Sequence, residues 1–399
     1  MNLFKKMYCR IYQGVFKIAM PILPYREPTT LDSVLEIKSV LKSNNIKKVL
    51  LVTDKGLKER GLTDTLEKNL SENEIECIVY DGTVPNPTID CIEEAKQMYI
   101  EHSCEGIIAF GGGSVMDCAK IVGARIVKPN QQVEDMKGLL KIRKKLPLLI
   151  AIPTTAGTGS ETTLAAVITD SKTHYKYPIN DFSLIPPYAV LDPSLTYGLP
   201  KNLTATTGMD ALTHAIEAYI GKSTTKKTRE ASLTACKLIF ENLPTACSSP
   251  KNKEARANML KASYLAGFAF TRSYVGYVHA VAHSLGGKYG TPHGLANAVI
   301  LPYFLTHYGA SIHKKLKNIA VYCDIANVTD TPKVASSKLI NKITALNASL
   351  GIPTKITGIK EKDIPALAVL AEKEGNPLYP VPKLMTAKEL EEIYHLVME

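Results

Sequence analysis

Short apolar runs alternate with helix-patterned stretches in the first half of the chain. The apolar runs are residues 47–54, 76–82, 105–113, 146–155 and 188–192, and the helical patterns include residues 91–102 and 114–126. Continuous apolar strands separated by helices are typical of a parallel sheet that is covered on both faces. The pattern therefore predicts an α/β fold for this half.

The pattern changes after Asp192. From there to the C-terminus helical periodicity prevails and β-branched runs are few, and Pro193, Gly198 and Pro200 interrupt the chain at the change. A chain of 399 residues is also too long for one ordinary core. We expect an α/β domain over 31–195 and an all-α domain over 196–399.

Residues 1–30 form a separate segment. Apolar pairs recur every four residues from Leu3 to Met20, and Lys5, Lys6, Arg10 and Lys17 occupy the opposite face. This pattern predicts a basic amphipathic helix, which could lie on an anionic membrane or dock on the protein body. Docking is the favoured interpretation, because an amphipathic stripe is most often a packing surface. A membrane span and a signal peptide are not expected.

Composition narrows the class of protein. A hydrophobic content of 45% and a charged content of 22% indicate a globular chain. The formal net charge is +10, but the lysines are scattered and no nucleic-acid-binding signature accompanies them, so we expect no nucleic acid partner. The eight cysteines form no CxxC pair, which favours reduced thiols and a cytoplasmic location.

Three histidines, His279, His283 and His293, fall within fifteen residues. The first two are four residues apart in a helical pattern, as are Asp210 and His214. Carboxylate and imidazole ligands suit Fe²⁺, Zn²⁺, Mn²⁺ or Co²⁺. Spacing alone does not establish that these residues converge, and a single helical histidine is usually an ordinary surface or core residue. The other histidines are expected at the surface: His102, His174, His307, His313 and His395.

Two loops at predicted strand ends suggest a nucleotide. The sequence GGGSVMD (111–117) follows a strand and opens a helix, with Ser114 as the expected N-cap, and it could bind a pyrophosphate or be a plain tight turn. The sequence PTTAGTGSETT (153–163) could contact phosphate, ribose or carboxamide groups, or could cap a helix. Asp54 ends another strand, where a carboxylate binds an adenosine ribose and favours NAD over NADP, or simply caps a turn or a helix.

Seven motifs in order resemble the iron-containing (group III) alcohol dehydrogenase family over residues 30–399. They are VTDKGL (52–57), DGTVPNPT (81–88), GGGSVMD (111–117), IPTTAGTGSE (152–161), GMDALTHAIEAY (208–219), GYVHAVAHSLGG (276–287) and TPHGLANA (291–298). The resemblance implies an N-terminal dinucleotide-binding α/β domain and a C-terminal helical domain, with the active site in the cleft between them.

The resemblance also implies roles for individual residues. The metal would be bound by Asp210, His214, His279 and His293, and His283 would lie beside the nicotinamide and the alcohol as a catalytic residue. Contacts with NAD are implied for Asp54, Asn86, Gly112, Gly113, Ser114, Asp117, Thr154, Thr155, Thr158 and Lys176.

The implied activity is hydride transfer between NAD(H) and small aliphatic alcohols or diols and their aldehydes, with Fe²⁺ or another divalent ion such as Zn²⁺. Dimers are common in the family, so a homodimer is expected. The alternatives are a glycerol-dehydrogenase-like or dehydroquinate-synthase-like enzyme that also uses NAD and a metal, and a metal-dependent hydrolase with a structural glycine loop. A non-catalytic, membrane-associated module is suggested only by the N-terminal segment.

Overall fold

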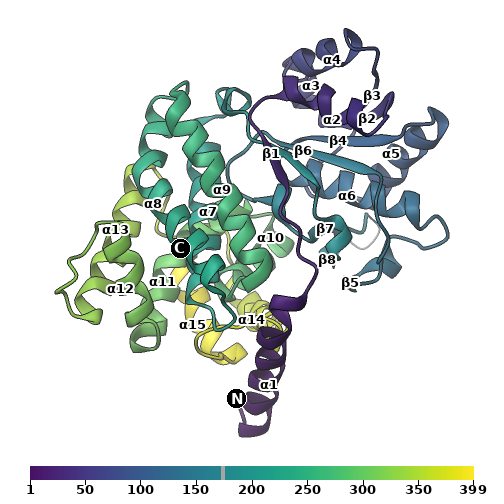
Figure 1. The fold of residues 1–399 in the computed structure, drawn as a ribbon. Helices are drawn as coiled ribbons and strands as arrows, with labels where there is room; N and C mark the ends of the chain where they lie inside the picture. Colours follow the sequence, from purple (N-terminus) through teal and green to yellow (C-terminus); the bar gives the residue numbers. More distant parts are fainter. Residues whose placement is uncertain (172–175) are drawn as a thin grey trace. The chain divides into compact units, whose positions relative to one another are not determined.

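The structure, a computed structural model, describes residues 1–171 and 176–399. The chain forms two compact units, which are described separately below. One unit comprises residues 24–198 and contains the strands. The other comprises residues 199–399 together with the first 23 residues and contains only helices among its regular elements (Figure 1).

Six strands of the first unit form a parallel sheet in the order β1-β9-β6-β4-β2-β3. They are β1 (Thr29–Leu31), β2 (Lys48–Val52), β3 (Glu76–Tyr80), β4 (Gly106–Gly111), β6 (Leu148–Pro153) and β9 (Tyr188–Val190). Five of them coincide with the five predicted apolar runs, and every pair of neighbours is parallel as predicted. The edge strand β1 was not predicted.

The sheet is buried on both faces because successive side chains of a strand point to opposite sides. Val49 and Leu51 of β2 lie in one apolar core, whereas Leu50 and Val52 lie in the other. All four side chains are fully buried. A strand without a solvated face has no polar alternation, which is why the sequence shows continuous apolar runs here.

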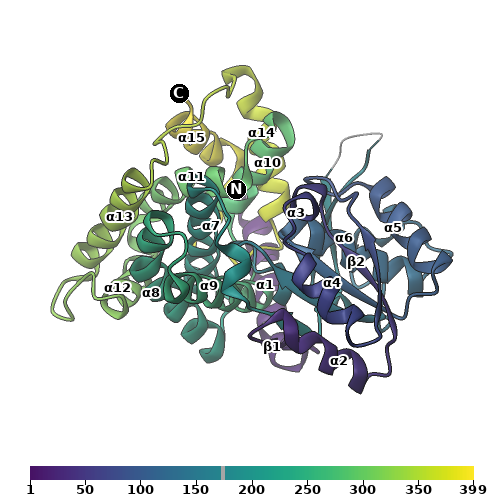
Figure 2. The same ribbon diagram turned by 90° about the horizontal axis from the view of Figure 1, so that it is seen from above.

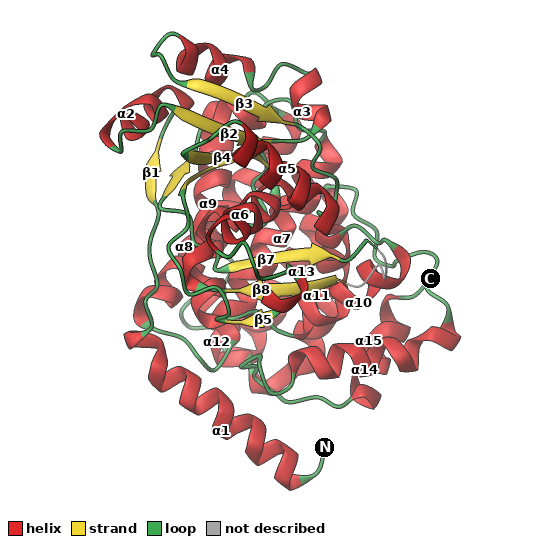
Figure 3. Cartoon of the chain, turned by 90° about the vertical axis from the view of Figure 1, so that its right-hand side faces the viewer, coloured by secondary structure: helices red, strands yellow, loops and turns green. Residues whose placement is uncertain are grey.

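Helices cover the two faces of this sheet (Figure 3). They are α2 (Ile37–Ser43), α3 (Lys55–Glu59), α4 (Asp64–Ser71), α5 (Ile89–Glu101) and α6 (Gly113–Val127). A small second sheet has the order β5-β8-β7 and pairs β7 with β8 in antiparallel fashion. Its strands are β5 (Gly138–Leu139), β7 (Ala165–Thr169) and β8 (Lys176–Asn180), none of which was predicted.

The second unit is helical, as predicted (Figure 2). Its helices are α1 (Leu3–Ala19), α7 (Lys201–Ile220), α8 (Lys226–Ser248), α9 (Lys253–Ser273), α10 (Tyr277–Tyr289), α11 (His293–Tyr308), α12 (His313–Tyr322), α13 (Pro332–Ser349), α14 (Ile364–Gly375) and α15 (Ala387–Val397). Helices α7 and α8 pack closely at Gly208, where a Cβ atom would lie 2.4 Å from Leu243 Cδ1.

Helix α1 docks on the helical unit with most of its apolar stripe facing away from the contact. Cys9 and Gln13 are its buried residues, whereas most of its large apolar side chains are exposed. The expectation of docking is met, but only part of the apolar stripe takes part: Phe16 packs edge-on against Tyr274, Arg10 and Gln13 make polar contacts, and the rest of the stripe is largely exposed. No helix in the described part of the chain is long and apolar enough to cross a bilayer.

Candidate metal and cofactor sites

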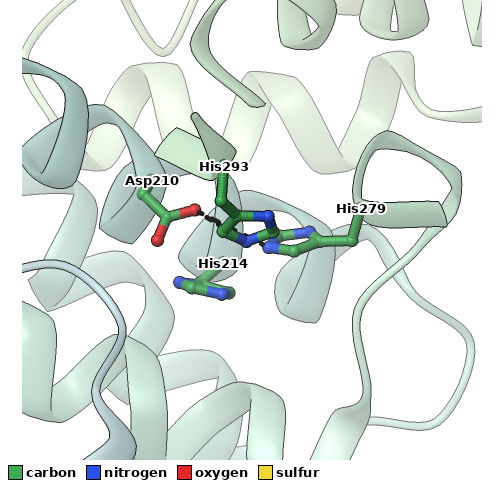
Figure 4. Close-up of side chains that lie close together, drawn as sticks. All are labelled: Asp210, His214, His279 and His293. Carbon is green, nitrogen blue, oxygen red and sulfur yellow. Dashed lines mark ion pairs between the residues drawn. The ribbon is translucent and has the colours of Figure 1, made fainter. Parts of the chain in front are cut away.

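Four side chains from three helices converge in the helical unit (Figure 4). Asp210 and His214 lie one turn apart on α7, His279 lies in the first turn of α10, and His293 is the first residue of α11. Each offers one ligand atom, and these atoms all lie within 4.8 Å of one another. Asp210, His214 and His279 are buried, and the His293 side chain is 38% exposed.

Close packing of α11 against α7 brings His293 to Asp210. A Cβ atom on Gly294 would lie 2.5 Å from the carbonyl oxygen of Thr206, so only glycine allows this approach. The result is a distance of 3.5 Å between His293 Nε2 and Asp210 Oδ1. His279 Nε2 lies 3.9 Å from the same oxygen.

These distances fit a shared metal ion. Ligands about 2.0–2.2 Å from one ion lie roughly 3–4 Å from each other in a tetrahedral site. His279 Nε2 is buried and has no hydrogen-bond partner among the described residues. A buried nitrogen without a partner is costly unless something else binds its lone pair. The donor set of one carboxylate and three imidazoles therefore suits a divalent transition metal.

Glu217, which sequence reasoning missed, orients His279. Its carboxylate is buried on α7, accepts hydrogen bonds from the backbone N–H groups of Gly276 (2.8 Å) and Val278 (2.9 Å), and lies 2.6 Å from His279 Nδ1. A carboxylate that accepts the Nδ1 proton leaves the Nε2 lone pair facing Asp210. Gly276 permits this contact, since a Cβ there would lie 2.5 Å from Glu217 Oε1.

The protonation states in this group favour neutral imidazoles. Burial, together with three neighbouring imidazoles, holds the pKa of His279 well below its usual range. Burial likewise lowers the pKa of His293 to about 4. Burial raises the pKa of Glu217 to about 7, although its backbone hydrogen bonds act in the opposite direction. Near neutral pH both histidines are therefore unprotonated, which is the form that binds a metal.

Asn297 is a second residue that sequence reasoning missed. Its Nδ2 donates to Asp210 Oδ1 at 2.6 Å and lies 3.1 Å from His293 Nε2. Both missed residues follow a candidate ligand at helical spacing: Glu217 is three residues after His214, and Asn297 is four residues after His293. Inspecting the positions one turn after His214 and His293 would have found them.

His283 lies one turn after His279 on α10 and is not in the four-residue group. Its Nδ1 is 2.7 Å from Glu374 Oε1, which also accepts a hydrogen bond from the Tyr379 hydroxyl at 2.7 Å. Its ring stacks on His293 with a centroid distance of 5.1 Å. Desolvation lowers the pKa of His283, but Glu374, by its charge and its hydrogen bond, and the charges of Asp210 and Glu217 act in the opposite direction, and the pKa is raised.

The histidines expected at the surface vary in exposure. His102 and His395 are exposed, and His307 and His313 are half-buried. His174 lies outside the described residues.

The predicted cofactor residues of the α/β unit follow adjacent strands. Asp54 comes after β2, Gly112 after β4 and Thr154 after β6, and these strands are neighbours in the sheet. Parallel strands place their carboxyl ends at one edge, where nucleotides bind in open α/β sheets. The predicted residues are therefore at the edge that this fold uses for such ligands.

Two of the predicted loops lie against each other at the start of α6. A Cβ on Gly113 would lie 2.9 Å from Thr158 Cγ2, and one on Gly112 would lie 3.4 Å from Thr155 Oγ1. The N-cap of α6 is Gly112 and not Ser114, because the helix already begins at Gly113. Ser114 Oγ instead accepts a hydrogen bond from the backbone N–H of Asn86 at 3.2 Å. The helix N-terminus thus has no side-chain cap, which leaves its N–H groups to an anion.

Other predicted cofactor residues have contacts within the unit. Asp54 is the N-cap of α3 and accepts from the backbone N–H of Leu57 at 3.0 Å, the structural role considered for it. Asp117 accepts from Ser160 Oγ and from the backbone N–H of Val167, both at 2.9 Å. Lys176 begins β8 and pairs with Thr169, whose N–H donates to the Pro87 carbonyl next to Asn86.

Lys120, which sequence reasoning did not single out, anchors the loop 153–163. Its fully buried ammonium donates to Ser160 Oγ and Thr163 Oγ1 (both 2.9 Å), and to the carbonyl oxygens of Thr163 (3.1 Å) and Ala165 (2.9 Å). Burial lowers the pKa of Lys120 to about 8. Glu161 in the same loop is also buried, and burial raises its pKa to about 7.

Comparison with known proteins identifies the family. The iron-containing alcohol dehydrogenase model matches residues 30–193, and the C-terminal model of the Fe-containing alcohol dehydrogenase family matches residues 204–398. The chain is 38% identical to the 1,3-propanediol dehydrogenase of Citrobacter freundii over 384 residues, which is 95% of this chain and 98% of that protein.

Solved structures of similar proteins support the same family. An alcohol dehydrogenase from Oenococcus oeni is 33% identical with a TM-score of 0.89, and the match covers 94% of this chain and all of that one (100%). A sulfoacetaldehyde reductase from Bifidobacterium kashiwanohense in complex with NAD⁺ is 29% identical with a TM-score of 0.83, over 94% of this chain and 98% of that one.

These matches confirm the predicted fold and the predicted class of enzyme, an NAD-dependent and metal-dependent alcohol dehydrogenase. They favour that class over the metal-dependent hydrolase considered from the sequence. With both halves matched by family models and a relative above 30% identity over nearly its whole length, the chain belongs to the iron-containing alcohol dehydrogenase family.

Proposed function

We propose that this chain interconverts small aliphatic alcohols or diols and their aldehydes, with Fe²⁺ bound by Asp210, His214, His279 and His293. The observation that carries this proposal is the convergence of four metal-binding side chains whose donor atoms lie within 4.8 Å of one another. A bound divalent ion would supply Lewis-acid polarisation of the substrate oxygen. Zn²⁺ is the alternative ion, since the same donors bind both.

The protein's own contribution at this site is orientation. Glu217 fixes the His279 ring so that Nε2 faces the other ligands, and Asn297 holds the Asp210 carboxylate through Oδ1. Both supports are buried, so their contacts with the ligands are shielded from water. Partners of this kind typically change metal affinity by about 10–100-fold.

His283 is proposed as the catalytic acid–base residue. Because Glu374 engages Nδ1, the other ring nitrogen, Nε2, is the atom available to accept a proton from the alcohol or return it to the product. The Tyr379 hydroxyl steadies Glu374 through a hydrogen bond to the same oxygen. Acid–base catalysis of this kind contributes about 10²–10⁴-fold to a rate.

The α/β domain, 31–195, is proposed to bind NAD(H), and the helical domain, 196–399, to bind the metal, with residues 1–30 as an extension. The uncapped start of α6 at Gly112, Gly113 and Ser114 supports a pyrophosphate site there. The other proposed contacts are Asp54, Asn86, Asp117, Thr154, Thr155, Thr158 and Lys176. Bound NAD⁺ would supply the hydride acceptor.

We also propose a cytoplasmic homodimer. All eight cysteines are free, which suits a reducing compartment, and the dimer is inferred from the family.

The proposal is tested with anaerobically purified protein. Elemental analysis should find about one metal ion per chain, and NADH should be oxidised with short aliphatic aldehydes or hydroxyaldehydes only while the metal is bound. Metal-loaded protein that oxidises no NADH with any aldehyde of such a panel would contradict the proposal.

A further inference from the structure

Helix α1 is attached to the helical unit by one face, where polar contacts join an edge-on contact between the rings of Phe16 and Tyr274 (centroid distance 4.8 Å). Gln13 Nε2 donates to the carbonyl oxygens of Tyr379 (2.7 Å) and Pro377 (3.2 Å). Arg10 donates to the carbonyl oxygens of Val381 (2.8 Å) and Pro382 (3.1 Å). Hydrogen bonds to a defined segment, residues 377–382, fix how the helix is rotated about its axis.

The opposite face of α1 is apolar and exposed. Its side chains recur every three or four residues, which places them on one side of the helix, away from Cys9 and Gln13. Their exposed fractions are Leu3 78%, Phe4 78%, Met7 53%, Tyr8 59%, Ile11 59%, Val15 62% and Ile18 80%, and Ile22 just beyond the helix is 85% exposed. Contiguous exposed apolar surface of this kind marks an interaction site.

Basic side chains border this apolar face, and acidic ones are absent from the segment. Lys5, Lys6, Arg10 and Lys17 lie within α1, and the first acidic residue of the chain is Glu27. Lys6 and Lys17 are exposed, and Lys5 remains half-exposed although it pairs with Glu372 at 2.6 Å. The surface therefore joins a hydrophobic stripe to an unbalanced positive charge.

We propose that α1 binds the surface of an anionic membrane, with its apolar face in the interfacial layer and its lysines at the lipid headgroups. Helices that lie in an interface have an apolar face, a basic polar face and low overall hydrophobicity. Each cation near an anionic leaflet adds to the attraction. The docking contacts leave the apolar face exposed, so the enzyme binds the membrane without breaking any contact between α1 and the helical unit.

Charge favours a membrane over a second copy of the chain as the occupant. Two copies of α1 packed face to face would bring their lysines together, with no acidic residue in either helix to pair with them. Like charges at such close range are repulsive. An anionic lipid surface satisfies both the apolar and the basic parts of the face.

The test is cosedimentation of the full-length, metal-loaded enzyme with vesicles. The enzyme should bind vesicles of phosphatidylcholine mixed with phosphatidylserine, and bind at least tenfold more weakly to phosphatidylcholine alone. The double variant Ile11→Ser/Ile18→Ser should lose at least tenfold in vesicle binding, and Lys6→Gln/Lys17→Gln should lose the preference for phosphatidylserine. Solution turnover should not change in either variant.

The matched control is Val328→Ser/Val369→Ser, which alters two exposed apolar residues elsewhere on the same unit (73% and 55% exposed) and should bind vesicles normally. Absence of vesicle binding by the unaltered enzyme, or an equal loss in the control, overturns the proposal. Sedimentation velocity tests the alternative occupant, a second copy of the chain. If the parent enzyme does not bind vesicles and Ile11→Ser/Ile18→Ser converts an oligomer to a smaller species, the face is a self-association surface and the proposal is overturned.

Discussion

The candidate metal group (Asp210, His214, His279 and His293) and the two candidate cofactor loops (111–117 and 153–163) are built on opposite principles. In the metal group, helices carry the ligands, and buried partners such as Glu217 and Asn297 orient them from the next turn. In the loops, Lys120 and Asp117 bind the loop itself at Ser160, and what remains for a ligand is mainly backbone N–H. One region therefore works through side chains on rigid elements, and the other through the conformation of its backbone.

This difference predicts which property of the protein a single substitution in each region changes. A change at a metal ligand acts first on metal binding and turnover, whereas a change inside the loop network acts first on the stability of the α/β unit. Variants that separate the two effects test the comparison directly.

The largest expected effect is at His279. His279→Ala should lose the metal and reduce turnover by at least about 10³-fold, since Lewis-acid stabilisation is worth several kcal/mol and each 1.36 kcal/mol is tenfold. His283→Ala, the matched control on the same helix, should keep the metal and lose about 10²-fold or more in rate. Metal content and NADH oxidation measured together decide the matter, and the reverse result would exchange the roles of the two histidines.

The loop network should respond to pH through Glu161. Burial raises its pKa in the folded protein from 4.5 to about 7, so its contribution to stability is complete below pH 4.5 and is lost as pH rises through 7. Glu161→Gln should abolish this decline, which amounts to at most about 3 kcal/mol of unfolding free energy. Urea unfolding at several pH values measures it. Glu72→Gln, at an exposed side chain of the same unit, is the control; parallel pH curves for Glu161→Gln and the parent would contradict the prediction.

A smaller effect is expected where a partner orients a ligand. Glu217→Gln should weaken metal binding about 10–100-fold, because the amide holds the Nδ1 proton of His279 less strongly. Glu374→Gln is the control, because Glu374 contacts His283 and not a metal ligand. Its metal dissociation constant should remain that of the parent enzyme. Competition with a chelator measures both constants, and equal losses in the two variants would refute the assignment of Glu217.

The smallest effect is expected at Asp54. Asp54→Ser keeps a side-chain cap on α3 but removes the carboxylate, so it should raise the KM for NADH and narrow the discrimination against NADPH. Asp54→Ala removes both functions and should also cost about 1 kcal/mol of stability. If Asp54→Ser leaves both cofactor constants unchanged, the residue is only a helix cap.

The sequence predicted most of what periodicity encodes. The five apolar strands and the paired spacing of Asp210 with His214 are local patterns, so they were found without coordinates. The small sheet was missed because β5 and β8 lack apolar runs, and the run at β7 (164–168) was passed over beside the polar loop 153–163. Glu374 was missed for a different reason: it meets His283 from 91 positions away, and no local pattern encodes such a contact.

Helix α1 shows a second limit of what sequence periodicity can predict. Its amphipathic pattern was read correctly as a helix, yet the pattern could not say which face meets the protein. The docked face is fixed by hydrogen bonds of Arg10 and Gln13 to carbonyl oxygens that only the fold places there.

The metal group draws its donors from α7, α10 and α11, segments that are separate along the chain. An ion bound there would tie three helices at one point, so loading and folding of the helical unit become one linked equilibrium. A free metal concentration one hundred times the dissociation constant would add about 2.7 kcal/mol to the free energy of unfolding. The cell's iron supply would then set how long this enzyme survives, as well as how fast it works.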